Sequence, residues 1–99
     1  MKKIAIITGA ARGIGNGIAY QLATEEYDIA ILDVFTQEDV NENIDRVKKA
    51  GAEVLYFKGD LSKSDDRIEF VKTVMEQYGR IDVLVNNAGI QNWMSVTSE

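Results

Sequence analysis

The sequence has 99 residues, of which 45 % are hydrophobic and 27 % are charged, and its formal net charge at pH 7 is −5. This is the composition of one small globular domain, and the acidic balance argues against nucleic-acid binding, which needs a cationic surface. Because cysteine and histidine are both absent, disulfides, thiolate or imidazole metal sites and histidine-based catalysis are excluded, and we expect a cytoplasmic protein without a metal site.

The first half of the chain predicts a strand, a helix and a second strand. The continuous apolar run Lys3–Thr8 is typical of a strand buried on both faces. A helix follows the glycine-rich turn after it, and Asp28–Asp33 predicts the second strand. The helix ends near Glu25 and Glu26 without a glycine. Either a residue there adopts the left-handed conformation, at a cost of about 1 kcal/mol, or the helix ends with a different cap. The apolar residues that recur at helical spacing in this first helix are Ile14, Ile18, Ala19 and Leu22.

The second half continues the alternation. Two more helices are predicted, ending at Gly51 and Gly79, where glycine is a typical terminator. Strands are predicted over Glu53–Lys58 and Ile81–Val85. The first of these helices is marked by the apolar residues Val40, Ile44 and Val47. The second begins near Ser62 or Ser64 and is marked by Ile68, Val71, Met75 and Tyr78.

This βαβαβαβ order predicts an α/β fold, a Rossmann-like doubly wound parallel sheet, because parallel strands need crossover helices. The expected strand order is 3-2-1-4, with the reversal beside the first strand. Apolar runs such as Ile29–Leu32 are too short to span a membrane. Thr8, Gly9 and Arg12 interrupt the apolar segment at the start, so we expect no secretory signal.

The turn after the first strand is a candidate anion site. The first N–H groups of a helix lack intrahelical partners and carry partial positive charge, and glycine lets a pyrophosphate approach the backbone closely. The glycines are Gly9, Gly13 and Gly15, one residue longer overall than the common G-x-G-x-x-G. Spacing alone is a weak signal, since such glycines also serve packing, but the position between strand and helix favours a dinucleotide site.

Asp33 ends the second strand, at the same edge of the sheet as the glycine loop. A carboxylate there can accept hydrogen bonds from the adenosine ribose and would repel a 2′-phosphate, which favours NAD over NADP. Alternatively, Asp33 caps the next turn. Arg12 in the loop opposes the preference for NAD, because a cation there could bind a 2′-phosphate.

Two further motifs follow the third and fourth strands. Asp60 and Leu61 could read the polar edge of an adenine, although an aspartate beside two serines is also a common helix cap. Asn86 and Asn87 precede Ala88-Gly89, and two asparagines in series suggest a brace between strands or a ligand contact.

Together these motifs resemble the classical short-chain dehydrogenase/reductase family. The residues that carry the resemblance are Thr8-Gly9-Ala10-Ala11-Arg12-Gly13-Ile14-Gly15, Asp33, Asp60-Leu61 and Asn86-Asn87-Ala88-Gly89.

The resemblance implies an NAD(P)-dependent oxidoreductase that transfers hydride between the nicotinamide and an alcohol or carbonyl substrate. Residues 9–15 (Gly9, Arg12, Gly13, Ile14 and Gly15 among them) would hold the pyrophosphate and Asp33 the ribose, with Val34 flanking the adenine and Asp60 and Leu61 at its edge. Asn87, Ala88 and Gly89 would line the cofactor, and Asn86 would brace the sheet.

The resemblance also shows which groups are absent. Family members are more than twice as long, and their catalytic serine, Tyr-x-x-x-Lys pair and further asparagine lie beyond Glu99. None of the four tyrosines here has a lysine four residues later: those positions hold Thr24, Ile31, Asp60 and Asp82. We therefore assign no catalytic residue and expect the 99 residues alone to be inactive.

The last predicted strand supports the expectation of a truncated or partial chain. Ile81, Val83 and Val85 would leave an apolar edge with one helix on that side, an arrangement that invites association. Residues 1–99 are therefore expected to be the N-terminal part of a single NAD(P)-binding Rossmann domain, from a parent that by resemblance forms homo-oligomers.

Two alternatives belong to other functional classes. A non-catalytic dinucleotide-binding module could dimerise through the fourth strand. An S-adenosylmethionine-dependent methyltransferase shares the layout, the glycine loop and the acidic strand end, but the asparagine motif and the glycine spacing count against it. The substrate of the parent stays open.

Overall fold

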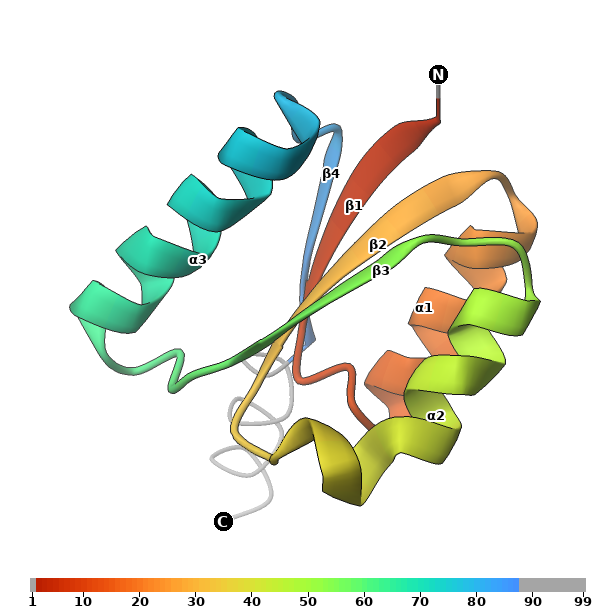
Figure 1. The fold of residues 1–99 in the computed structure, drawn as a ribbon, viewed down its shortest axis with the longest axis horizontal. Helices are drawn as coiled ribbons and strands as arrows, with labels where there is room; N and C mark the ends of the chain where they lie inside the picture. The colour runs from red at the N-terminus through yellow and green to blue at the C-terminus, as the bar shows by residue number, and fades with distance from the viewer. Residues whose placement is uncertain (1, 88–99) are drawn as a thin grey trace, which may run out of the picture.

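The computed structural model describes residues 2–87. Strands and helices alternate along the chain as the sequence predicts (Figure 1), with boundaries within two residues of the expected strands. The elements are β1 (Lys3–Thr8), α1 (Gly13–Thr24), β2 (Tyr27–Asp33), α2 (Gln37–Lys49), β3 (Val54–Lys58), α3 (Ser64–Tyr78) and β4 (Val83–Asn86).

The four strands form one parallel sheet in the order β3-β2-β1-β4. This confirms the predicted Rossmann-like α/β fold and its strand order. Thr8, at the end of β1, lies beside Leu32 of β2 and Asn86 of β4. The carboxyl ends of these strands therefore meet at one edge, where the following loops can form a site.

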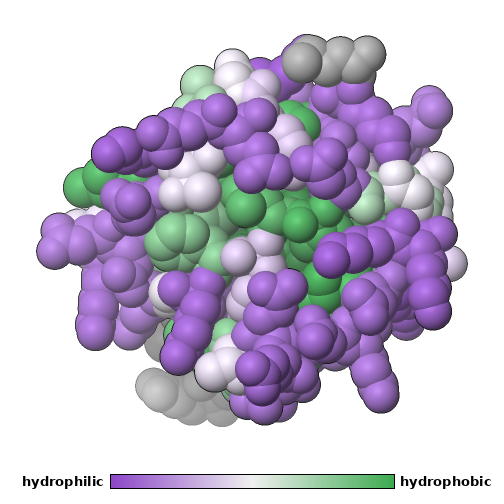
Figure 2. Space-filling model, in the orientation of Figure 1, coloured by the Kyte–Doolittle hydropathy of each residue, from purple (hydrophilic) through white to green (hydrophobic). Residues whose placement is uncertain are grey.

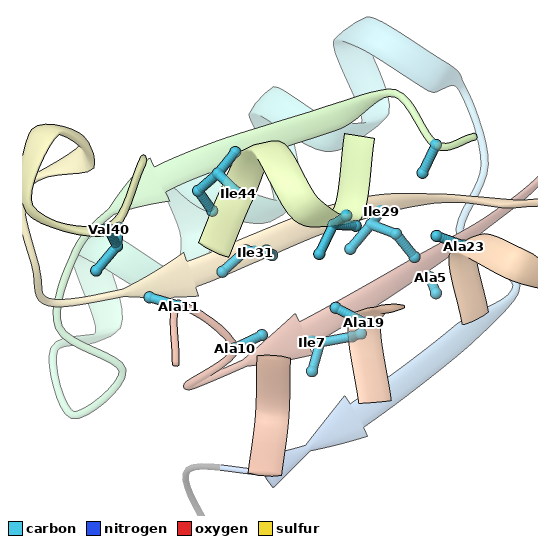
Figure 3. Close-up of a cluster of buried hydrophobic side chains, with 12 residues drawn as sticks. Ala5, Ile7, Ala10, Ala11, Ala19, Ala23, Ile29, Ile31, Val40 and Ile44 are labelled. Carbon is cyan, nitrogen blue, oxygen red and sulfur yellow. The ribbon is translucent and has the colours of Figure 1, made fainter. Parts of the chain in front are cut away.

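Both faces of the sheet are covered by helices (Figure 1), which explains why β1 and β2 are continuously apolar. On one face, Ile7 and Ile31 join a buried cluster with α1 and α2 (Figure 3). On the other, Ile6 and Leu32 pack with Phe70 of α3. The first cluster consists of Ala5, Ile7, Ala10, Ala11, Ala19, Ala23, Ile29, Ile31, Val40, Ile44, Val47 and Ala52.

The helix ends follow the predicted terminators, with one informative exception. Gly79 caps α3 in the left-handed region, and Gly51, just after α2, also has positive φ. At the end of α1 the cap residue Glu25 has φ −98°, but Glu26 has φ 69°. The chain thus makes its left-handed turn with a glutamate, in a conformation that usually favours glycine.

The structure corrects the expected faces of α3 and β4. Ile68, Val71 and Met75 are all exposed, while Phe70 and Val74 are the buried residues of α3. Along β4, Val83 and Val85 pack on the side of α1 and α2 rather than beside α3. Leu84 instead points to the α3 side and is 67 % exposed. There it lines an apolar groove of about 170 Å³ together with Ile6, Leu32, Phe70, Val71 and Ile81.

The surface in Figure 2 shows hydrophobic residues gathered in the middle, where Figure 1 places the sheet, surrounded by hydrophilic residues. Among residues 2–87, no helix has the length and apolar character needed to cross a bilayer.

Candidate cofactor-binding site

A cleft of about 750 Å³ lies at the carboxyl edge of the sheet, over the ends of β1, β2 and β3. It is formed by the glycine loop, the loop after β2 and the loop after β3, which converge because parallel strands end at the same edge. The lining residues are Gly9, Arg12, Gly13, Leu32, Asp33, Val34, Phe35, Gly59, Asp60, Leu61 and Ser62.

The three glycines of the loop have two different structural roles. Gly9 and Gly13 have φ of 67° and 64°, values at which a side chain would be strained. Gly15 is needed for a different reason, because a Cβ there would lie 2.4 Å from the Gly9 carbonyl oxygen and 2.6 Å from the Asn87 amide nitrogen. Two glycines therefore set the turn and one permits close packing.

The start of α1 suits a bound anion. The N-cap residue, Arg12, makes no side-chain capping bond, and the first turn of α1 contains no acidic residue. The first N–H groups of the helix thus have no side-chain cap competing for them, and the first turn itself contributes no negative charge that would repel a phosphate.

Three asparagines hold the loop carbonyls. The Asn87 amide donates to Gly9 O at 3.0 Å, Asn16 to Ala10 O at 3.1 Å and Asn43 to Ala11 O at 3.0 Å. These donors come from the end of β4, from α1 and from α2. Each of these three carbonyl oxygens is therefore engaged by an amide donor, which fixes the conformation of the loop.

Asp33 joins the end of β2 to this loop. Its Oδ2 accepts a hydrogen bond from Ala11 N at 3.0 Å and its Oδ1 accepts one from Val34 N at 2.8 Å. The carboxylate therefore caps the following turn, as the alternative interpretation predicted, and also lines the cleft. Each oxygen retains a lone pair for a further donor such as a ribose hydroxyl.

Tyr56 lies on β3, next to the end of β2. Its hydroxyl donates to Phe35 O at 2.7 Å, which fixes the loop after β2. Burial, and secondarily the negative charge of Asp33, raise the pKa of Tyr56 to about 12. Tyr56 is therefore a permanent donor under ordinary conditions and not an acid–base group.

The loop after β3 forms the third wall of the cleft. Asp60 Oδ1 accepts hydrogen bonds from the Ser62 hydroxyl at 2.7 Å and the Ser62 N–H at 2.9 Å. These bonds, the side-chain bond first, lower the pKa of Asp60, so the carboxyl is ionised at the rim. The Leu61 carbonyl accepts from Arg67 at 2.6 Å. Ser62 thus closes a turn before α3, which begins at Ser64.

Asn86 and Asn87 act in different ways. Asn86 Oδ1 accepts a hydrogen bond from the Thr8 hydroxyl at 3.2 Å, which links β4 to β1 as the resemblance implied. Asn87 is 2 % exposed and supports the glycine loop from below. Ala88 and Gly89 lie outside the described residues.

Most of the predicted site residues come together in the cleft, namely Gly9, Arg12, Gly13, Asp33, Val34, Asp60 and Leu61. Gly15 and Asn87 lie beneath the loop, and Ile14 is 67 % exposed, outside the cleft lining.

Sequence reasoning missed four lining residues: Leu32, Phe35, Gly59 and Ser62. Each of these residues lies within two positions of Asp33 or Asp60 in the sequence. That closeness is the signal from which they could have been predicted. Within residues 2–87 no group of three acidic side chains is placed to hold a metal ion.

Comparison with known proteins agrees with this geometry. The sequence model of the short chain dehydrogenase family matches residues 3–99. The 3-oxoacyl-(acyl-carrier-protein) reductase FabG of Staphylococcus epidermidis is 41 % identical over 90 residues, which are 91 % of this chain and 37 % of that protein. The chain therefore spans little more than a third of that relative's length.

Solved structures are similar over the same portion. A short-chain dehydrogenase/reductase from Sinorhizobium meliloti superposes with a TM-score of 0.85 at 42 % identity, covering 90 % of this chain and 41 % of that one. A 3-oxoacyl-(acyl-carrier protein) reductase from Brucella melitensis in complex with NAD gives 0.79 at 39 % identity, covering 88 % and 33 %.

An alcohol dehydrogenase from Thermococcus sibiricus complexed with 5-hydroxy-NADP gives a TM-score of 0.72 at 40 % identity, covering 83 % of this chain and 35 % of that one. The alternating fold, the glycine loop braced at the carboxyl edge of the sheet and the match over residues 3–99 lead to one conclusion: the chain belongs to the short chain dehydrogenase family.

Proposed function

We propose that this chain is the N-terminal, cofactor-binding part of an NAD(P)-dependent oxidoreductase. Residues 1–99 would be part of a single Rossmann domain whose remainder supplies the catalytic groups. The parent protein would transfer hydride between a nicotinamide cofactor and a small alcohol or carbonyl substrate. Four of the relatives and structures compared above are named as reductases or dehydrogenases, two of them solved with a nicotinamide dinucleotide or its analogue.

One observation carries the proposal: the Asp33 carboxylate and the start of α1 line the same cleft. A dinucleotide offers a diol and a pyrophosphate, and these two groups need a carboxylate acceptor and a helix N-terminus respectively. The cleft lies over β1, β2 and β3, so it fits the adenosine half of the cofactor.

The residue roles follow from this placement. The loop from Gly9 to Gly15 would bind the pyrophosphate, and Asp33 would accept hydrogen bonds from the adenosine ribose. Val34 would cover one side of the adenine, with Asp60 and Leu61 at its edge. Asp33 favours NAD as the principal cofactor, because a carboxylate repels a 2′-phosphate.

The chemistry would be supplied by the nicotinamide, which accepts or donates a hydride when it is bound. The described residues would bind and orient the adenosine half, and none of them is assigned to proton transfer. A cytoplasmic, homo-oligomeric parent that binds neither nucleic acid nor membrane is also part of the proposal, on the strength of the acidic composition and the family.

Calorimetric titration of the 99-residue chain with ADP-ribose tests the proposal, because ADP-ribose contains only the groups that this cleft would bind. We expect saturable one-to-one binding, weakened about tenfold in Asp33→Asn, which keeps an acceptor oxygen but loses the charge. The control is Asp45→Asn on the outer face of α2. Equal affinity in both variants would refute the role of Asp33, and absence of binding in the folded wild type would refute the proposal.

A further inference from the structure

Val34 and Leu61 line the cleft from two different loops, and we call the part of the cleft between them the adenine slot. Val34, on the loop after β2, is 53 % exposed, whereas Leu61, on the loop after β3, is half-buried. The two loops leave the sheet joined, because the Gly59 N–H donates to the Asp33 carbonyl oxygen at 2.9 Å. Beyond this bond, the width of the slot depends on what holds each loop.

The loop after β2 is held by Tyr56, which lies outside the cleft lining. The Tyr56 hydroxyl donates to the carbonyl oxygen of Phe35, the residue after Val34, at 2.7 Å. Tyr56 stands on β3 beside Ile31 of β2, and its side chain packs against the core cluster on the side of α1 and α2. Burial raises the pKa of Tyr56 to about 12, so the hydroxyl keeps its proton and remains a donor.

The loop after β3 is held from the first turn of α3. Asp66 Oδ2 accepts a hydrogen bond from the N–H of Asp60, the residue before Leu61, at 2.7 Å. Arg67 donates to the Leu61 carbonyl oxygen, but Arg67 is exposed whereas Asp66 is half-buried, so water competes less with the Asp66 bond. Neither Asp66 nor Arg67 lines the cleft.

We propose that Tyr56 and Asp66 are positioning residues that set the width of the adenine slot and thereby determine how firmly the cleft holds the base. The inference rests on the proposed function and deepens it. Dispersion contacts between a base and apolar side chains are lost in part when a gap of about 1 Å opens. Walls that are fixed before binding also save the entropy of ordering two loops. Both hydrogen bonds lie outside the cleft, so removing either one changes the slot without removing a contact to the ligand.

The test uses ADP-ribose and its etheno-adenine derivative, whose base is fluorescent. Tyr56→Phe removes one hydroxyl and Asp66→Ala removes one carboxylate. In calorimetry on the 99-residue chain, we expect each variant to bind ADP-ribose about three- to fivefold more weakly than the wild type, because one hydrogen bond is lost. In complexes saturated with etheno-ADP-ribose, the fluorescence anisotropy of the base should fall in both variants, because the base moves more freely in a looser slot.

Each variant has a matched control. Tyr20→Phe removes a hydroxyl from an exposed tyrosine of α1, and Asp65→Ala removes the neighbouring carboxylate from the same first turn of α3. Both controls should bind ADP-ribose as the wild type does. Asp66→Asn keeps an acceptor oxygen and should retain most of the affinity. Urea denaturation measures stability separately, because a purely structural role would lower stability without changing the anisotropy of the saturated complex.

Three results would overturn the inference. The first is wild-type affinity for ADP-ribose in both Tyr56→Phe and Asp66→Ala, and the second is weaker binding with unchanged anisotropy of the base. The third is an equal loss in Asp65→Ala and Asp66→Ala, which would assign the effect to the charge at the start of α3. In each, ADP-ribose still binds the wild type and the proposed function stands. Failure of ADP-ribose to bind the folded wild type would instead refute the proposed function, and this inference with it.

Discussion

At the scale of single residues, the glycine loop depends on three asparagine side chains that are not part of the glycine motif. Asn16, Asn43 and Asn87 each donate to a different carbonyl of the loop, and they come from three separate elements. A loop with three bound carbonyls has few alternative conformations. Such a loop is organised in advance, which would reduce the entropy lost if it binds a phosphate as proposed.

Asn43 offers the clearest test of this support, because it lies on α2, outside the cleft lining. We expect Asn43→Ala to weaken ADP-ribose binding about three- to tenfold, since Ala11 O loses its donor at 3.0 Å. The matched control is Asn41→Ala, an exposed asparagine on the same helix, which should bind as the wild type does. Calorimetry measures both, and equal affinities would show that the Asn43 bond does not organise the loop.

Gly15 and Gly17 both lie in α1, but replacing them with alanine should have opposite effects on stability. Gly15→Ala should lower the free energy of unfolding by about 1–3 kcal/mol, because its Cβ would meet backbone and the Asn87 amide. Gly17→Ala has no atom within 4 Å of its new Cβ and should raise stability by about 0.5–1 kcal/mol. Urea denaturation distinguishes them, and a stabilised Gly15→Ala would contradict the packing described here.

At the scale of elements, the turn between α1 and β2 carries local strain in Glu26. Glu26→Gly should raise the free energy of unfolding by about 1 kcal/mol, since glycine adopts φ near 69° without penalty. Glu25→Gly, at φ −98°, should give no such gain and instead lower stability. Thermal denaturation of the two variants, compared with the wild type, measures the difference; a destabilised Glu26→Gly would show that the glutamate side chain has another role.

Asp82 links the starts of β1 and β4. Its carboxylate accepts the Ile4 N–H at 2.8 Å and pairs with Arg80 at 2.6 Å. The Arg80 bond first, then the Ile4 bond, lower the pKa of Asp82 below its ordinary value of 3.8. A carboxyl whose pKa is lower in the folded state stabilises the fold above the unfolded pKa, and this contribution is lost as pH falls through the folded pKa.

Asp82→Asn should therefore be less stable than the wild type at neutral pH, and the difference should shrink as the pH falls below 3.8. Part of the acid sensitivity should remain, because the pKa of Asp60 is lowered as well. Urea denaturation across the pH range measures this. A difference that is independent of pH would exclude the charge of Asp82 as its cause.

Sequence patterns predicted the elements well where burial is two-sided and less well where it is partial. The run Lys3–Thr8 was located correctly because both faces of β1 are covered. The predicted faces of α3 and β4 were wrong, because Val71 remains exposed although it is apolar, and Val83 and Val85 pack on the side of α1 and α2. Apolar periodicity marks a helix or strand, but it does not show which apolar residues will find a partner.

In the cleft, too, some residues could be predicted from the sequence and others could not. Asp33 and Asp60 could be placed from strand ends, because parallel strands end at a common edge. Phe35 and the supporting Asn43 could not, since the direction of a loop side chain and a hydrogen bond across 32 positions leave no local pattern. The position of the candidate site was thus predicted from topology, whereas the side chains that support it could be identified only in the structure.

At the scale of the whole molecule, the cleft at the carboxyl edge of the sheet adjoins the apolar groove, because Leu32 and Leu61 line both. The groove extends from there between α3 and β4, where Leu84 is 67 % exposed. Contiguous exposed apolar surface binds hydrophobic dyes and promotes association.

Leu84→Ser should therefore lower the fluorescence of the dye 8-anilinonaphthalene-1-sulfonate bound to the folded chain by about half, because the groove loses a prominent apolar wall. Met75→Ser, exposed on α3 but outside the groove lining, should change it little. If both variants bind dye as the wild type does, the dye-binding surface lies elsewhere.

The central claim is that residues 2–87 already form the adenosine half of a dinucleotide site. Titration of the ¹⁵N-labelled chain with ADP-ribose, followed by amide NMR shifts, tests it most directly. We expect saturable shifts concentrated at Gly9, Gly13, Val34 and Asp60, which line the cleft but not the groove, with little change along the outer face of α2. Saturable shifts confined to the groove beside Leu84, or no shifts in a folded chain, would contradict the account.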